Sequence, residues 1–317
     1  MKIKKYLISL LCLLIVVFTE KVFSADINYI EKMDAGIVNF GTIKNLSFKA
    51  NIKVELKAKL MKEMGAKYED ISFSMPVEAK IDGTKFLYKQ SYEGVPVEIN
   101  DPYVISYDDK LFQIYKPSAQ YLYFTSKKPD HNFTELSGLE LIYSPFEFVI
   151  SALKQVDVDT FIVNPYNYNY LKNIFSLKDI TIKNITDHDV VFETCSFHDN
   201  EYGDLSYIVT IAKDNYLPRS WKMFNKKSVV IKEYKVNKWG FISDNKLSYP
   251  EISEESLYSN SGELLRHCTV NITNVEVSNK EFSFTLDPRL ATKINDSDRN
   301  LYINTKTGKI IDGDTLK

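Results

Sequence analysis

Cysteine, glycine and proline are scarce in this chain of 317 residues, which has 3, 11 and 10 of them. So little glycine and proline excludes collagen-like and low-complexity proteins. An excess of positive charge is also lacking, because 40 Lys and Arg face 42 Asp and Glu, and this argues against a basic nucleic-acid binder. The chain is 44% hydrophobic and 13% aromatic, which is enough for a packed core and excludes a disordered protein.

Histidine is equally scarce, and the common catalytic and cofactor motifs are absent. None of the four histidines lies in an H-E-x-x-H pattern, and the sequence has no G-x-S-x-G, G-x-G-x-x-G, P-loop or C-x-x-C motif. Cys195 and His198 supply only two ligands for a metal. His267 and Cys268 are neighbours in a predicted strand, so they point to opposite faces. We predict no catalytic residue, no cofactor and no metal.

The first 24 residues have the layout of a secretory signal. Three lysines before residue 6 precede an apolar run over 6–18, and Ser24 fits the last position before cleavage, with Ala25 as an alternative. The other interpretation is an uncleaved membrane anchor, but a spanning helix needs about 20 apolar residues. Lipid attachment at Cys12 is rejected, because Leu11 stands where a small residue is expected. We predict secretion across the inner membrane into the periplasm, with an extracellular location as the alternative.

The mature chain, 25–317, is predicted to be one domain with a C-terminal tail. No linker, low-complexity tract or strong repeat divides it. Its two remaining cysteines, Cys195 and Cys268, would pair or stay as free thiols, and their spacing does not decide between these outcomes.

Alternation of apolar and polar residues is the clearest structural signal. It runs from 46 to 60, longer than strands usually are, so this strand should bend or break. It returns over 71–82, where Asp82-Gly83 predicts a hairpin turn into a strand with Phe86, Tyr88 and Tyr92. The apolar side of these strands is either ordinary core or a surface that holds an acyl chain. Its candidate ligand-binding residues are Phe48, Ile52, Val54, Phe73, Met75 and Val77.

The remaining pattern predicts helices over 26–40 and 144–153. Asp187-His188-Asp189 is typical of a turn. Further strands are expected over 104–107, 111–115, 121–125, 190–197, 205–211, 228–236, 264–275 and 282–286. This order favours an α+β fold in which helices pack on the apolar, concave face of a long antiparallel sheet.

Acidic residues and tyrosines offer an alternative function. Paired carboxylates could hydrolyse a glycoside if the fold brought them to one cleft, although acids between strands are usually solvated turns. A tyrosine-rich run at 166–170 could stack on a sugar, but a half-buried strand edge explains it as well. The acids concerned are Asp157, Asp159, Asp187, Asp189, Glu193, Asp199 and Glu201.

Several segments resemble the LolA/LolB-like family, the periplasmic carriers and receptors of outer-membrane lipoproteins. They are residues 43–56 (IKNLSFKANIKVEL), 81–86 (IDGTKF), 105–115 (ISYDDKLFQIY), 217–221 (LPRSW), 275–277 (VEV) and 282–288 (FSFTLDP). The resemblance covers most of residues 26–290. It implies an incomplete, strongly curved antiparallel barrel, with helices as a lid over a hydrophobic cavity. It also implies non-catalytic binding of a lipid or a lipid-modified protein.

The sequence thus predicts a secreted binding protein that carries or senses an acyl chain, lipid or lipoprotein anchor. Its expected partners are the acyl chain and, transiently, a membrane or an envelope protein, and no nucleic acid is expected. The alternatives are a secreted carboxylate-based hydrolase and a structural or interaction domain with a filled core.

Overall fold

The computed structural model describes residues 45–63, 65, 69–82, 85–95, 102–127, 180–194, 197–199, 203–242, 247–278 and 280–313. The predicted signal at 1–24, the helices over 26–40 and 144–153, the tyrosine-rich run and Cys195 lie outside the described residues. The packing of helices on the concave face therefore stays a prediction.

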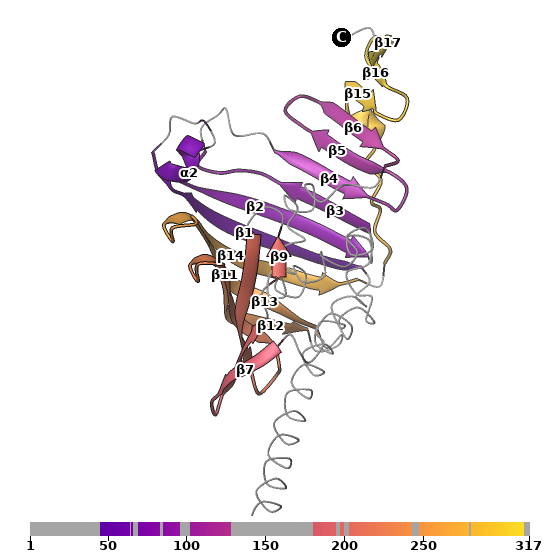
Figure 1. Cartoon of the computed structure of the whole chain (residues 1–317). Coiled ribbons are helices and arrows are strands. Elements are labelled where there is room, and N and C mark those ends of the chain that lie inside the picture. Colours follow the sequence, from indigo (N-terminus) through magenta and orange to yellow (C-terminus); the bar gives the residue numbers. More distant parts are fainter. Residues whose placement is uncertain are drawn as a thin grey trace, which may run out of the picture.

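The described residues form one curved, mainly antiparallel sheet of seventeen strands (Figure 1). Pairing runs from β7 through β8, β10, β11, β12, β13 and β14 to β1, and then through β2 to β6 and β15 to β17, with β9 beside β10. Only the β6–β15 pairing is parallel among these strands. Because β7 and β17 do not pair in the described part of the chain, the sheet is not closed.

The strands have the following bounds. The N-terminal group is β1 (Leu46–Leu56), β2 (Ile71–Asp82), β3 (Lys85–Gln90), β4 (Tyr103–Tyr107), β5 (Phe112–Lys116) and β6 (Tyr121–Thr125). The central group is β7 (Ile180–Ile185), β8 (Asp189–Thr194), β9 (Phe197–Asp199), β10 (Gly203–Ala212), β11 (Pro218–Asn225), β12 (Val230–Ile242), β13 (Leu247–Tyr258) and β14 (Leu264–Val277). The C-terminal group is η3 (Pro288–Leu290), β15 (Lys293–Asp296), β16 (Leu301–Asn304) and β17 (Ile310–Asp312).

The first long strand breaks, as its predicted length required. Alternation continues in the sequence to residue 60, but β1 ends at Leu56 and a short helix, α2 (Ala58–Glu63), follows. The Asp70 carboxylate accepts a hydrogen bond from the Ala58 backbone N–H at 2.8 Å. The backbone N–H of Lys57 donates to the Leu265 carbonyl at 2.9 Å. These contacts satisfy backbone groups at the start of α2 and hold it against the end of the sheet.

Most predicted strands are confirmed, and the differences are local. The strand expected over 190–197 ends at Thr194, and Phe197 belongs to β9. Tyr92 lies beyond β3. Strands β7, β11 and β13 were not predicted, nor were β15 to β17, which lie in the predicted C-terminal tail.

The strand expected over 282–286 is wrong. These residues pair with no strand in the described structure, although Phe284 and Leu286 are buried. The Leu286 backbone N–H donates to the Gln113 side chain at 2.9 Å, and the Thr285 hydroxyl donates to Asp108 at 2.7 Å. A side chain, that of Gln113, therefore satisfies a backbone N–H that a strand ladder would otherwise engage.

The main core lies on one side of the central sheet. Trp221 is completely buried, stacks on Tyr234 at 5.8 Å and meets the edge of Tyr207 at 5.7 Å. Smaller clusters lie among β3 to β6 and where β15 joins β6. The C-terminal residues thus extend the sheet beyond β6 (Figure 1).

Candidate functional site

The six predicted ligand-binding residues share one face of β1 and β2. Val54 pairs with Phe73, and Ile52 pairs with Met75, while Phe48 and Val77 fall in the same phase of the alternation. Phe48, Ile52, Val54 and Val77 are buried, whereas Phe73 and Met75 are only partly buried. The structure therefore brings all six together, with four of them in the core.

This face continues across the neighbouring strands. Directly opposed residues in a sheet project to the same side. From Val54 the register leads to Cys268 on β14, then to Glu255 on β13, Tyr234 on β12 and Trp221 on β11. We call the surface that contains this row, on β11 to β14, β1 and β2, the apolar face. One residue of this row, Glu255, carries a carboxylate.

Glu255 is held between two cations on the same face. Its carboxylate accepts a hydrogen bond from the Arg266 guanidinium at 2.6 Å and lies 3.5 Å from the Lys232 ammonium. The side chains of Glu255, Lys232 and Arg266 are 15%, 18% and 36% exposed. The Lys232 ammonium also lies 5.8 Å from the centre of the Trp221 ring, which adds a cation–π contact.

These charges decide the protonation state of Glu255. Burial would raise the pKa of its carboxyl, but the positive charges and hydrogen bonds of Lys232 and Arg266 outweigh burial and lower this pKa below its ordinary value. The neighbouring Cys268 is a free thiol, and burial raises its pKa to about 11 despite the nearby cations. The carboxylate is thus ionised and the thiol protonated at neutral pH.

Ser253 adds a hydroxyl to the same face. It lies two residues before Glu255 on β13 and pairs with Val236 and Val270, which are both buried. Ser253 is 1% exposed, and its hydroxyl oxygen has no hydrogen-bond partner. We call Lys232, Ser253, Glu255 and Arg266 the polar group.

Half-buried apolar side chains border the polar group where β1 ends. Arg266 pairs with Leu56 on one side and Leu257 on the other, and Leu56 pairs in turn with Ile71. Leu56, Leu257 and Ile71 are all partly exposed, like Phe73 one row away. An accessible part of the apolar face therefore lies at this end of the sheet, beside the polar group.

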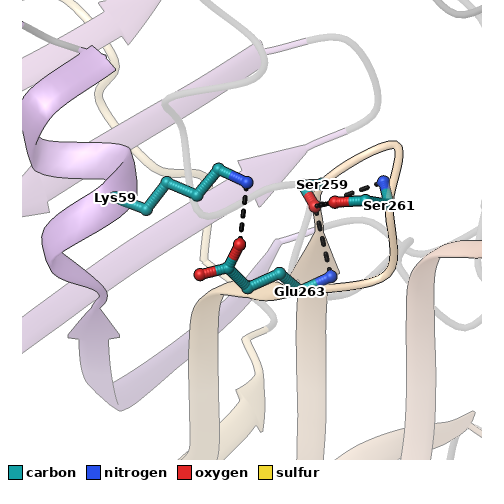
Figure 2. Close-up of polar contacts among 4 residues, drawn as sticks. All are labelled: Lys59, Ser259, Ser261 and Glu263. Carbon is teal, nitrogen blue, oxygen red and sulfur yellow. Dashed lines mark hydrogen bonds and ion pairs between the residues drawn. The ribbon is translucent and has the colours of Figure 1, made fainter.

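A separate set of contacts fixes α2 at the same end. The Lys59 ammonium lies 2.8 Å from the Glu263 carboxylate, in the turn between β13 and β14 (Figure 2). The Ser259 hydroxyl accepts hydrogen bonds from the backbone N–H groups of Ser261 and Glu263 and lies 2.8 Å from the Ser261 hydroxyl. These residues close the turn and hold the helix near the start of β14.

The other candidate chemical groups are not gathered into a site in the described structure. Asp189 forms an ion pair with Arg219, and Glu193 forms one with Lys183. Asp157, Asp159 and Glu201 lie outside the described residues. His267 contacts Ser256 at 3.0 Å and pairs with Glu55, on the face opposite Cys268, as predicted.

Sequence reasoning missed the polar group. Strand β13, which supplies Ser253 and Glu255, was not predicted. A signal was nevertheless present in β14, where Arg266 shares the phase of Cys268, Val270 and Ile272. A charged residue in the apolar phase of a strand indicates a special environment.

Among the described residues, no group of three or more His, Cys, Asp or Glu side chains could hold a metal ion. No helix in this part of the chain has the length and apolar character needed to span a membrane.

No family model matches this chain, and no curated protein matches it. Solved structures with a similar fold include a DUF1329 family protein from Desulfovibrio piger, at 12% identity and a TM-score of 0.39, covering 83% of this chain and 94% of that one. A LolA superfamily protein from Nitrosomonas europaea has 13% identity and a TM-score of 0.39, covering 82% and 97%. A putative outer membrane lipoprotein-sorting protein domain from Vibrio parahaemolyticus has 9% identity and a TM-score of 0.37, covering 75% and 88%. LolA superfamily proteins, which the sequence resembles, are thus among its structural neighbours.

Proposed function

We propose that this chain is a non-catalytic binding protein of the cell envelope that carries or senses an acyl chain. The observation that carries the proposal is the accessible end of the apolar face, where Leu56, Ile71, Phe73 and Leu257 are only partly buried. Partly exposed apolar side chains that adjoin each other gain by excluding water, and an apolar ligand can supply this contact.

The burial of the six predicted residues supports a smaller ligand surface than the sequence suggested. Phe48, Ile52, Val54 and Val77 are buried and act as core beneath the ligand. Phe73 and Met75 remain as its direct contacts, together with the apolar residues next to Arg266. Burial of each CH₂ group of a ligand contributes about 0.8 kcal/mol. A chain of several CH₂ groups therefore reaches useful affinity without any chemical step.

The place of action follows from the predicted secretory signal. We propose the periplasm, where an acyl chain moving between membranes needs an apolar surface that shields it from water. The acyl chain would belong to a lipid or to a lipid-modified protein, and the carrier would contact the membrane or an envelope protein only during exchange.

Native mass spectrometry of the protein purified from its own host, with lipid extraction, tests this function. We expect a mature chain that begins at Ala25 and carries added mass that extracts as acyl lipid or lipopeptide. Cargo can exchange away during purification, so the decisive step is reloading. The delipidated protein is titrated with acyl ligands of increasing length, and affinity should rise about fourfold per added CH₂. Failure to bind any acyl ligand would contradict the proposal and favour a domain with a filled core.

A matched pair of variants locates the ligand on the apolar face. Met75→Lys places a charge on this face, where Met75 is half-buried, and should weaken acyl binding at least tenfold because the ammonium resists desolvation. Ser72→Lys adds the same charge on the opposite, exposed face of β2 and should leave binding unchanged. Equal binding by both variants would place the ligand elsewhere.

A further inference from the structure

The polar group is an unusual feature on a face that otherwise forms the core. The other face of β1 and β2 carries exposed Lys49, Lys53 and Glu78, so the sheet can place charges in water. Lys232, Glu255 and Arg266 instead project beside Trp221 and Cys268. Moving ions out of water costs several kcal/mol each, and a buried ion pair is often no more stabilising than well-packed apolar residues. Packing alone therefore gives no reason for this arrangement.

We propose that the polar group binds the anionic head group of an amphipathic ligand, with a phosphate or carboxylate oxyanion held by Lys232 and Arg266. This inference rests on the proposed function, because the acyl chain of the same ligand would lie on the half-buried apolar residues beside the group. Head-group recognition and chain binding would then occupy adjacent parts of one surface.

The geometry suits an oxyanion. The three charged side chains carry a formal net charge of +1, and both cations keep part of their surface exposed. Arg266 presents a planar set of donors that matches carboxylate and phosphate oxygens, while Lys232 acts as a compact charge. Glu255 contacts both cations, at 2.6 and 3.5 Å, and so positions them.

Ser253 gives an independent indication of a ligand. A buried hydroxyl without a hydrogen bond is destabilising, and such groups are rare in folded proteins. Its position two residues from Glu255 on the same face corresponds to roughly 7 Å along the strand. A head group with several oxygens can span this distance, so that one oxygen meets the cations and another accepts from Ser253.

Binding of four probes to the delipidated full chain tests the inference. The probes are palmitate, palmitoyl lysophosphatidic acid, uncharged monopalmitoylglycerol and inorganic phosphate. We expect at least one of the two anionic acyl probes to bind about tenfold more tightly than monopalmitoylglycerol at pH 7. Inorganic phosphate should not compete at the same concentration, because it lacks the chain.

The outcomes separate the two proposals. Equal affinity for charged and uncharged acyl probes would overturn the head-group site while leaving the proposed function intact. Binding of neither class would overturn both. Competition by inorganic phosphate as strong as that of lysophosphatidic acid would overturn the assignment to a lipid head group and indicate a site for the free anion.

Two variants change anion binding in opposite directions. Ser253→Ala removes a buried hydroxyl with no partner, so folding should persist, and affinity for the preferred anionic probe should fall roughly tenfold. Glu255→Gln raises the formal charge of the group from +1 to +2 and should increase the preference for anionic over uncharged probes. Lys238→Gln, on an exposed part of β12, is the matched control and should alter neither. A purely structural polar group would leave the preference for anions unchanged in all three variants.

Discussion

Replacing Arg266 with methionine should strongly destabilise the fold, because it leaves a charge buried with one partner fewer. Methionine keeps much of the apolar stem of the arginine side chain, so packing changes little. The Glu255 carboxylate, which is 15% exposed, would keep only the Lys232 ammonium at 3.5 Å. The variant therefore isolates the electrostatic contribution of the guanidinium.

The magnitude follows from the distances. With an effective dielectric constant of about 20, charges at the 2.6 Å and 3.5 Å separations attract by roughly 6 and 5 kcal/mol before desolvation is subtracted. Removing one partner of a buried pair typically costs about 3 to 5 kcal/mol. Arg266 is 36% exposed, so water screens part of its charge, and we expect the lower limit, about 3 kcal/mol.

The assay is urea unfolding at pH 7, followed by the fluorescence of tryptophan, since Trp221 is completely buried in the core. Arg266→Met, Glu255→Met, the double variant and the native chain form a double-mutant cycle. The double variant removes the carboxylate together with the guanidinium, and Lys232 is unchanged in it. It should therefore be at least about 2 kcal/mol more stable than the sum of the two single losses predicts.

Two results would refute this reasoning. A loss below about 1 kcal/mol for Arg266→Met would mean that water screens the group like a surface ion pair. Additive losses in the double variant would mean that the two side chains contribute separately to packing and that their charges are not coupled.

Three further predictions concern the same face. The wild-type chain should be more stable than Glu255→Gln, and this difference in unfolding free energy should be complete above about pH 5. It should decline as the pH falls through the folded-state pKa of Glu255, because this pKa lies below that of an unfolded glutamate, about 4.3. Urea unfolding of both chains from pH 7 to pH 3 measures the difference. Cys268, in a chain whose other cysteines are replaced by serine, should react slowly with a thiol reagent at pH 8 when folded and much faster in urea, because burial raises its pKa to about 11; equal rates would contradict its burial. Trp221→Ala should cost about 4 kcal/mol in urea unfolding, since it removes the ring packed against Tyr207 and Tyr234, and a loss below about 2 kcal/mol would show that these neighbours close the space.

Strict alternation made β1 and β2 predictable from the sequence. Each apolar residue of β1 has a polar neighbour, and a slip of one residue would expose every apolar side chain, so the pattern and the fold agree. The same reasoning located the six candidate ligand residues on one face. It did not reveal that four of them are buried, because burial depends on what packs above the face.

Strands that the local sequence did not indicate form because neighbouring strands pair with them. β13 contains Pro250, three glutamates and three serines, a composition typical of a loop. It is a strand because β12 and β14 supply ladder partners on both sides. Residues 282–286 show the opposite case, because Phe284 and Leu286 alternate with polar residues as in a strand and yet no strand forms. The Gln113 side chain instead accepts the hydrogen bond from the Leu286 backbone N–H.

Because strand pairing and burial were not visible in the sequence, the polar group could not be recognised from it. Lys232, Glu255 and Arg266 come from three strands, and each alone is an ordinary charged residue in a mixed pattern. Their meaning depends on the register that sets Tyr234 opposite Glu255 and Glu255 opposite Cys268. With that register known, the side that each charge faces follows from the pleat alone, since Cys268 lies opposite Val54 of the core. Charges placed there against the cost of desolvation, next to a buried serine with no partner, are where a polar ligand would compensate for that cost. An acyl carrier that used only its apolar surface would gain nothing from them, so the response of binding to head-group charge is the property that distinguishes the two kinds of carrier.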